Sequence, residues 1–417
     1  MNGAFDGFGI PKDLRTEDST IKNDPYLLKI RSILSRDNIM DTYSREDTKK
    51  LQQDLLYPYL NFFLKNYKKD YYKKLFLSRG LSKDENGSLK DNLVLSDLIK
   101  LRIHSDDLRG DGQERRLVDH FSNKKYGMSF MSSGTTAGTN GPVNLYRSNI
   151  SLDLSRTTNG NLIDWSLGKK IEGGECLFHM APEMTNFLAF AAIGSDFLRE
   201  RGLKVSFGAK IKSGPKDSTI WQRIAPNLRE MRKFFKSKND TKYFIASGVG
   251  LYKMFIEPKG IKSLIMKLSL GAPPVFLGKN GVLMISGGLK RLPEEITSLG
   301  QVVGSTSNKI YLDKNDKKTT APVVDMLGLT ESGNVFIGLP NHPNSDEPWV
   351  KYPHPLSYTA LLNSPNDLTP VTNPEAGKEY LLFYVNFATL DYIEAIIPGD
   401  FVIPAADTPR IQTVMGE

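Results

Sequence analysis

Cysteine and histidine are scarce in this 417-residue chain, which contains one cysteine and five histidines. The single thiol, Cys176, excludes an internal disulfide framework and any metal site built from several thiolates. No apolar run approaches the roughly eighteen residues of a membrane-spanning helix. Residues 1–6 also lack the basic-then-apolar order of a signal peptide. We therefore expect a cytoplasmic protein with no membrane span.

The composition that remains is typical of a globular enzyme-sized protein. Hydrophobic residues account for 39% of the chain, charged residues for 24% and aromatic residues for 10%. These ordinary fractions argue against intrinsic disorder, collagen-like repeats and coiled coil. At about 150 residues per unit, the length corresponds to two or three structural units.

Basic residues outnumber acidic residues by 55 to 47, for a net charge of +8. A net positive field of this kind can favour nucleic acid, acidic lipid, phosphorylated substrates or an acidic protein partner. Much of the excess lies in residues 65–74 (KNYKKDYYKK), on a helix predicted to begin after Ser44. Alternating lysine and tyrosine can bind nucleic acid, with an affinity that falls steeply with salt. We favour a helical face with tyrosines against the protein and lysines in water, and expect no nucleic-acid partner, because no nucleic-acid motif accompanies the stretch.

The pattern of apolar and charged residues divides the chain into a helical N-terminal region and an α/β core. Residues 26–108 carry long mixed-charge segments and no strong strand signal, so residues 1–110 are expected to form a helical layer packed on a core of residues 111–417. From Tyr126 onward, short apolar runs alternate with glycine-bearing turns and amphipathic stretches, as in an α/β sheet. The predicted strands are 176–180, 203–207, 243–247, 282–286, 309–312, 334–338 and 379–385.

Helices are predicted between these strands, at residues 184–200, 218–236, 248–257 and 290–299. Crossovers of that length imply a largely parallel sheet with helices on both faces. The segment 339–374 is rich in Pro, Asn and Asp and is expected to be an irregular surface excursion.

A run of hydroxyl and glycine residues carries the strongest chemical signal. It spans residues 131–142 (MSSGTTAGTNGP) and contains Ser132, Ser133, Gly134, Thr135, Thr136 and Gly138. Glycines let the backbone approach an anion, and successive N–H and hydroxyl groups can surround phosphate oxygens. The run is not a Walker loop, because the Gly-Lys-Ser/Thr ending is missing. On composition alone it could also be an ordinary turn.

Three further motifs each follow an expected strand. They are Gly287-Gly288, then Gly328-Leu329-Thr330-Glu331, and finally Asp400 in the sequence Pro-Gly-Asp. Open α/β sheets bind ligands at such strand ends. Their order and spacing resembles the adenylate-forming (acyl-AMP synthetase) superfamily over about residues 125–405. Within it the chain is most similar to the acyl-protein synthetase branch, the bacterial luminescence fatty-acid activating component, with phenylacetate-CoA ligases as cousins.

The resemblance implies an adenylate-forming large-domain core with parallel-rich sheets flanked by helices. It also implies ATP-dependent activation of a fatty or aryl carboxylic acid to an acyl-adenylate, with Mg²⁺ as cofactor and release of pyrophosphate. The acyl group would then pass to a carrier protein, CoA or a reductase partner. Cys176 lies inside a predicted strand, so we do not expect self-acylation there.

The same resemblance implies a role for each site residue, and each residue also has an alternative, purely structural interpretation. Residues 132–136 and Gly138 would hold the β- and γ-phosphates, Thr330 the α-phosphate, and Glu331 the Mg²⁺ ion. Gly287, Gly288 and Gly328 would leave bare backbone for adenine and the acyl group, and Asp400 would accept hydrogen bonds from the ribose hydroxyls. Locally, the same residues could be turns, a Thr-Glu helix N-cap pair and a turn aspartate.

His179, at the end of a predicted strand, would lie near the acyl carboxylate; alternatively it is a satisfied core histidine. On the next predicted helix, Phe187, Phe190 and Ala191 could line an acyl pocket or simply pack in the core.

The chain departs from the superfamily pattern in three places. No lysine follows the glycine loop, and the nearest cation is Arg147. Leu327 stands where an adenine-stacking aromatic is usual. Only residues 401–417 follow Asp400, so the C-terminal lid with its catalytic lysine is expected to be missing, with Arg410 as a remnant of the hinge. These departures leave open a non-catalytic or partner-dependent scaffold subunit that retains the fold.

Overall fold

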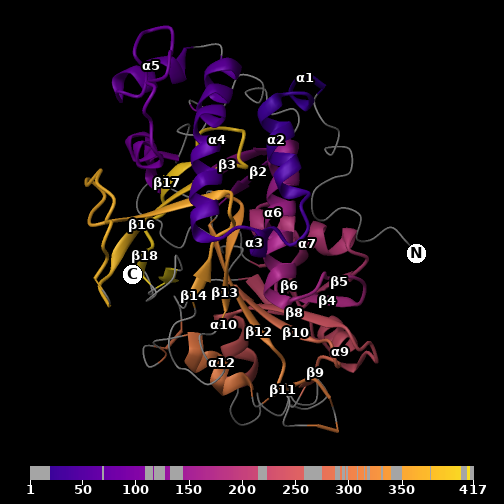
Figure 1. Ribbon diagram of the computed structural model, residues 1–417. Coiled ribbons are helices and arrows are strands. Elements are labelled where there is room, and N and C mark those ends of the chain that lie inside the picture. Colours follow the sequence, from indigo (N-terminus) through magenta and orange to yellow (C-terminus); the bar gives the residue numbers. More distant parts are fainter. Residues whose placement is uncertain are drawn as a thin grey trace.

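The computed structural model describes residues 19–67, 70–108, 116, 127–131, 144–214, 223–257, 275–286, 292–293, 296, 299–307, 309–313, 315–316, 320–329, 332–339, 350–375, 377–404 and 411–413. A 13-stranded sheet runs through the molecule, with a helical layer at the N-terminal end (Figure 1). No helix in the described residues combines the length and apolarity needed to cross a membrane.

The N-terminal layer is helical, as predicted. Its elements are α1 (Ser19–Lys22), α2 (Pro25–Leu34), α3 (Ile39–Thr42), α4 (Arg45–Asn66), α5 (Tyr71–Ser78), two 3₁₀ segments (Leu95–Leu101 and Ser105–Leu108) and the short strand β1 (Ile103–His104). A capping box at Ser44 starts α4, because the Ser44 hydroxyl accepts the Asp47 N–H at 3.1 Å.

The prediction of one continuous helix through residues 65–74 is wrong. Helix α4 ends at Asn66, and Asp70 takes a left-handed conformation before α5 begins. The prediction that the tyrosines pack against the protein and the lysines face water is confirmed for the described side chains. Tyr67 and Tyr72 are buried, whereas the Lys65 side chain is 67% exposed.

The parallel half of the sheet is confirmed. Its order is β5 (Lys204–Phe207), β4 (Glu175–Phe178), β8 (Lys242–Ser247), β10 (Val282–Ser286) and β12 (Val323–Leu329), with every neighbouring pair parallel.

Helices cover both faces of this parallel half, as predicted. Alternate residues such as Phe178 and Met284 pack with α6 (Asn149–Leu167) and α7 (Ala189–Glu200). Residues of the other parity, such as Leu177 and Leu283, pack with α9 (Leu228–Lys236), α10 (Gly248–Leu251) and α12 (Leu299–Ser307).

The other half of the sheet is antiparallel, which the sequence reading did not anticipate. It contains β13 (Asn334–Leu339), β14 (Val350–Tyr352), β15 (Ser357–Leu362), β16 (Tyr380–Asn386), β17 (Ala395–Ile397), β18 (Phe401–Pro404) and β19 (Ile411–Thr413). β18, β19 and β14 lie between β16 and β13 in the sheet order, yet the two strands are in contact, because the Asn334 amide donates to the Tyr384 hydroxyl at 3.2 Å. The 339–374 segment was expected to be irregular but carries β14 and β15. Its strand β15 pairs with β16 over six residues, and this burial outweighs the turn-rich composition.

Two of the predicted helices are wrong in extent. Residues 184–200 form a 3₁₀ turn (Pro182–Asn186) followed by α7. Within 218–236, the hairpin of β6 (Ala209–Ile211) and β7 (Ile224–Pro226) precedes α9, because Pro226 ends the strand and Asn227 caps the helix. The helix at 248–257 is confirmed as α10 and a π turn (Tyr252–Ile256). Most of 290–298 lies outside the described residues, and α12 begins at Leu299; a small sheet of β9 (Val275–Phe276) and β11 (Ile310–Tyr311) packs nearby.

Candidate functional site

The carboxyl ends of four adjacent parallel strands meet at one edge of the sheet. Ser247 ends β8, Ser286 ends β10, and the two are register partners; His179 directly follows β4, and β12 ends at Leu329. This edge is where open α/β sheets bind ligands. The predicted residues Gly287, Gly288, Thr330 and Glu331 come directly after β10 and β12, and they lie outside the described residues.

The glycine-rich run is attached to an antiparallel hairpin. β2 (Gly127–Met131) pairs with β3 (Asn144–Ser148), and Met131 is the register partner of Asn144. Residues 132–143, which include Ser132 to Thr136 and Gly138, lie outside the described residues. The strands on either side are held by burial, since Phe130 is 0% and Leu145 is 1% exposed.

His179 is held tightly at the end of β4. Its backbone N–H donates to the Ile245 carbonyl at 2.7 Å, which extends the ladder with β8 by one residue. The ring lies against Gly250 in α10, where a Cβ would stand 2.5 Å from Nδ1. The residue is partly exposed, but Nδ1 is buried and has no hydrogen-bond partner among the described residues. Burial lowers the pKa of His179 to about 4, so the imidazole is neutral near pH 7.

The turn against His179 went unnoticed in the sequence. Ser247 caps α10 by accepting the Gly250 N–H at 3.0 Å, so the capping hydroxyl and the glycine facing His179 belong to the same turn. The signal was present as Ser-Gly-Val-Gly after the apolar run 243–246, a strand-to-helix turn like the other glycine motifs.

Apolar side chains gather beside this edge. Phe187 and Phe190 are half-buried, and a Cβ on the exposed Gly328 would lie 3.8 Å from the Phe190 Cβ, so the start of α7 reaches the end of β12. Ala191, in contrast, is fully buried and packs in the core. The other half-buried members of this cluster are Met180, Ile211 and Ile224.

Asp400 belongs to the antiparallel half of the sheet. It directly precedes β18, and its carbonyl accepts the Leu382 N–H at 3.0 Å. In the sheet order, β18 is separated from β12 by β13, β14 and β19. Gly399 beside it has φ +85°, a conformation that favours glycine.

Arg147, the cation nearest the glycine loop in sequence, belongs to strand β3 of that hairpin. The side chain is 2% exposed, and its Nη1 lies 3.6 Å from Asp391 Oδ2 and 3.5 Å from Glu394 Oε2. Burial opposes its charge, but Tyr392, Glu394 and Asp391 together raise the Arg147 pKa above its usual value. Asp391 Oδ1 also accepts the Ser148 N–H at 3.1 Å. The guanidinium therefore anchors the root of the hairpin through buried carboxylates.

A second buried ion pair crosses three strands at β13. Asp325 of β12 and Lys351 of β14 pair above Gly338, where a Cβ would stand 2.8 Å from Lys351 Nζ. Burial lowers the pKa of Lys351 to about 7. The only sequence signal was an aspartate within the apolar run 323–329.

Within the described part of the chain, no group of three or more His, Cys, Asp or Glu side chains could hold a metal ion. The predicted Mg²⁺ ligand, Glu331, lies outside that part.

The sequence matches no known family model and no curated protein. The fold nevertheless matches that of solved adenylate-forming enzymes, which confirms the predicted fold class, while membership of the superfamily stays a prediction.

The solved structures that carry this fold include 2-hydroxyisobutyryl-CoA ligase. Its open conformation, in complex with 2-HIB-AMP and CoA, matches at a TM-score of 0.55 and 12% identity, over 88% of this chain and 68% of that one. The thioesterification state of the same ligase matches at 0.51 and 12% identity, over 99% and 72%. Its postadenylation state with 2-HIB-AMP matches at 0.50 and 13% identity, over 99% and 71%. At these identities the likeness establishes the fold, and the acyl-protein synthetase branch stays a prediction.

Proposed function

We propose that this protein uses ATP to activate a carboxylic acid as an acyl-adenylate and then transfers the acyl group to a thiol or partner protein. The observation that carries the proposal is the shared edge of β4, β8, β10 and β12. His179, Ser247 and Ser286 stand at this edge, and the motifs at Gly287-Gly288 and Thr330-Glu331 come directly after two of its strands. The similar ligase, by comparison, is described with 2-HIB-AMP and CoA bound.

In the proposed reaction, a carboxylate oxygen attacks the α-phosphorus in line, the bond to the β-phosphate oxygen breaks, and pyrophosphate leaves. The loop from Ser132 to Gly138 would hold the β- and γ-phosphates through N–H and hydroxyl groups. Thr330 would bind the α-phosphate, and Asp400 the ribose hydroxyls. Glu331 would ligate Mg²⁺, a hard cation that prefers carboxylate and phosphate oxygens and neutralises phosphate charge when bound.

The apolar cluster beside Gly328 supports a fatty or aryl acid as substrate. Phe187 and Phe190 are half-buried there, so apolar surface adjoins the edge where the carboxylate would react. A neutral His179 could hydrogen-bond an acyl oxygen without adding a charge.

The acyl acceptor would be an external thiol, on a carrier protein, CoA or a reductase partner. Cys176 is fully buried in β4, and burial raises the pKa of its thiol well above the usual value. A buried neutral thiol is a poor nucleophile, which supports the expectation that the chain does not acylate itself at this residue.

Carboxylate-dependent ATP–pyrophosphate exchange tests the proposal without requiring the acceptor. A panel of aliphatic, aryl and amino acids is assayed with the wild type, Glu331→Ala and the matched control Glu172→Ala at an exposed position. We expect one acid class to stimulate exchange, Glu331→Ala to reduce it by about 100-fold or more, and Glu172→Ala to behave as wild type. Exchange of equal rate in Glu331→Ala, or none from any acid, would contradict the proposal.

A second candidate is a non-catalytic or partner-dependent subunit that retains the fold. The observation that favours it is the position of Arg147, whose charge is already compensated by Asp391 and Glu394. Nucleotide binding that requires neither Mg²⁺ nor Glu331, together with absent exchange, would support this candidate instead.

A further inference from the structure

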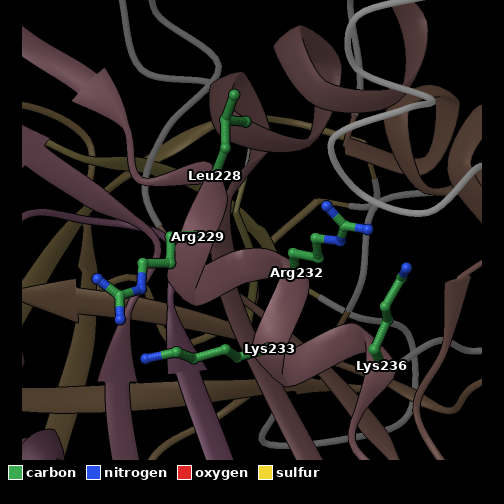
Figure 2. A pocket seen from close by; sticks show the side chains of 5 residues that line it. All are labelled: Leu228, Arg229, Arg232, Lys233 and Lys236. Carbon is green, nitrogen blue, oxygen red and sulfur yellow. The ribbon is translucent and has the colours of Figure 1, made fainter.

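Helix α9 has two faces of opposite chemistry. Met231, Phe234 and Phe235 are buried against the sheet, whereas the four basic residues of the helix are exposed. The basic positions follow the i, i+3, i+4, i+7 spacing of a single helical face. In the view of Figure 2, Arg229 and Lys233 extend to the left of α9, and Arg232 and Lys236 extend to its right.

The basic face borders a surface hollow of about 460 Å³, with Leu228 at its end. Glu230 pairs with Lys233 at 2.6 Å. No carboxylate in the described residues forms an ion pair with Arg229, Arg232 or Lys236. These three positive charges therefore face solvent and are available to bind a negatively charged partner.

The start of α9 adjoins the candidate site. The Asn227 N–H donates to the Gly208 carbonyl at 2.8 Å, and the Gly208 N–H donates to the Phe178 carbonyl at 2.7 Å. A Cβ at Gly208 would lie 3.3 Å from Met231 Cγ and 3.5 Å from His179 Cδ2. A partner lying along the basic face would thus have one end close to the edge where the acyl group is activated.

We propose that the basic face of α9 is the docking surface for an acidic protein that accepts the acyl group. This rests on the proposed function, since it names the partner of the same site. Arg229 to Lys236 spans about 10 Å of helix, which suits a row of carboxylates on a partner helix better than one phosphate. None of the five residues that line the hollow is aromatic, so a nucleotide base has no ring to stack on.

The experiment uses an acidic holo-acyl carrier protein as the probe and measures its Kd for the full chain at low and high salt. The test variant is Arg229→Glu/Arg232→Glu. The matched control is Lys49→Glu/Lys50→Glu, which makes the same charge change at exposed positions of α4 in the N-terminal layer. Circular dichroism verifies the fold of both, and ATP–pyrophosphate exchange is measured in parallel.

We expect the test variant to bind the carrier protein at least about tenfold more weakly and the control to stay within about twofold of wild type. Salt should weaken the wild-type complex far more than the residual binding of the test variant. Exchange should be unchanged in both variants. If the wild type shows no ATP–pyrophosphate exchange but the Kd values follow the expected pattern, the proposed function is contradicted and the docking surface is still supported.

Three results would overturn the docking proposal. The first is no binding of the carrier protein by the wild type at low salt, and the second is equal weakening in both variants, which indicates general charge attraction. The third is an unchanged Kd for the carrier protein in Arg229→Glu/Arg232→Glu with loss of affinity for a single-stranded oligonucleotide, which would assign the face to nucleic acid.

Discussion

The hydroxyl of Tyr59 accepts a hydrogen bond from the Glu394 backbone N–H at 3.2 Å, although 335 residues separate them in sequence. Tyr59 belongs to α4, and both residues are fully buried. Glu394 in turn faces Arg147, at the root of the hairpin that carries the glycine-rich loop. The N-terminal layer is thereby connected to the element expected to hold phosphates.

Two more tyrosines of the layer make equivalent contacts. The Tyr72 hydroxyl accepts the Ile393 N–H at 3.1 Å, and the Tyr26 hydroxyl donates to the Phe387 carbonyl at 2.6 Å. In Figure 1 the helices of the layer lie beside β16 and β17. The layer shares one hydrophobic core with these two strands, and β1 pairs in parallel with β17. We infer that the layer supports the segment 387–394.

Replacing Tyr59 by Phe tests this connection. The change leaves the buried Glu394 N–H without its acceptor, so the free energy of unfolding should fall by about 1–3 kcal/mol. Urea unfolding provides the measurement. Tyr358→Phe is the control, because the Tyr358 hydroxyl has no hydrogen bond in the described residues, and a loss as large there would count against the special role of Tyr59.

Removing one partner of the Asp325–Lys351 pair should lower the free energy of unfolding much more than replacing both partners by apolar residues. Lys351→Met leaves the Asp325 carboxylate buried without its cation, so we expect a loss of about 3–5 kcal/mol in unfolding free energy. The double variant Asp325→Leu/Lys351→Met should recover most of that loss, because no charge remains buried. Denaturant titration of four proteins, the wild type, both single variants Lys351→Met and Asp325→Leu, and the double variant, gives the coupling, and additive losses would contradict the pair.

Gly250 should be required for the position of His179. In Gly250→Ala the new methyl would stand 2.5 Å from His179 Nδ1, so the ring must move. We expect the rate of ATP–pyrophosphate exchange to fall about tenfold while the fold is retained, because small displacements of groups at a reacting centre lower the reaction rate. The control is Gly304→Ala in α12, where the new Cβ would have no heavy atom of the described residues within 4 Å apart from its chain neighbours and the backbone of its own helix. Wild-type exchange in Gly250→Ala would remove His179 from the site.

His354 should contribute to loss of stability in acid. It is 1% exposed, its Nδ1 accepts the Leu356 N–H at 3.1 Å, and burial lowers its pKa from 6.5 to about 3. Between those two values the unfolded chain holds a proton that the folded chain does not, so the free energy of unfolding falls as the pH falls. His354→Asn keeps an acceptor for Leu356 and removes the titration.

The measurement is urea unfolding at pH 7, 5.5 and 4.5 for both proteins. The variant should lose less stability than wild type on acidification. Parallel pH profiles would show that His354 titrates alike in the folded and unfolded states.

Much of the parallel half of the sheet was predictable from the chain. Runs such as 243–247 and 282–286 became β8 and β10, because short apolar runs bounded by turn residues are too short for a typical helix and are consistent with buried interior strands. The glycine motifs that follow them were recognisable because glycine directly after an apolar run indicates a turn at the end of a strand. Where Pro, Asn and Asp dominate, as in 339–374, the local signal was misleading, and β15 forms because β16 is there to pair with it.

The partners of the buried charges could not be predicted in this way. Ser148 and Asp391 are 243 residues apart in sequence, and Asp325 meets Lys351 only because Gly338 leaves room between their strands. Periodicity and turn residues express local backbone preferences and burial, which a sequence displays directly. A buried ion pair depends on which distant strands become neighbours, since desolvating either charge is favourable only when its partner is already in place. The sequence alone therefore identified part of the sheet, including β4, β5, β8 and β10, and the glycine motifs. Most of the antiparallel half, the anchoring of the hairpin and the basic face beside the site arose from the way the strands and helices assemble.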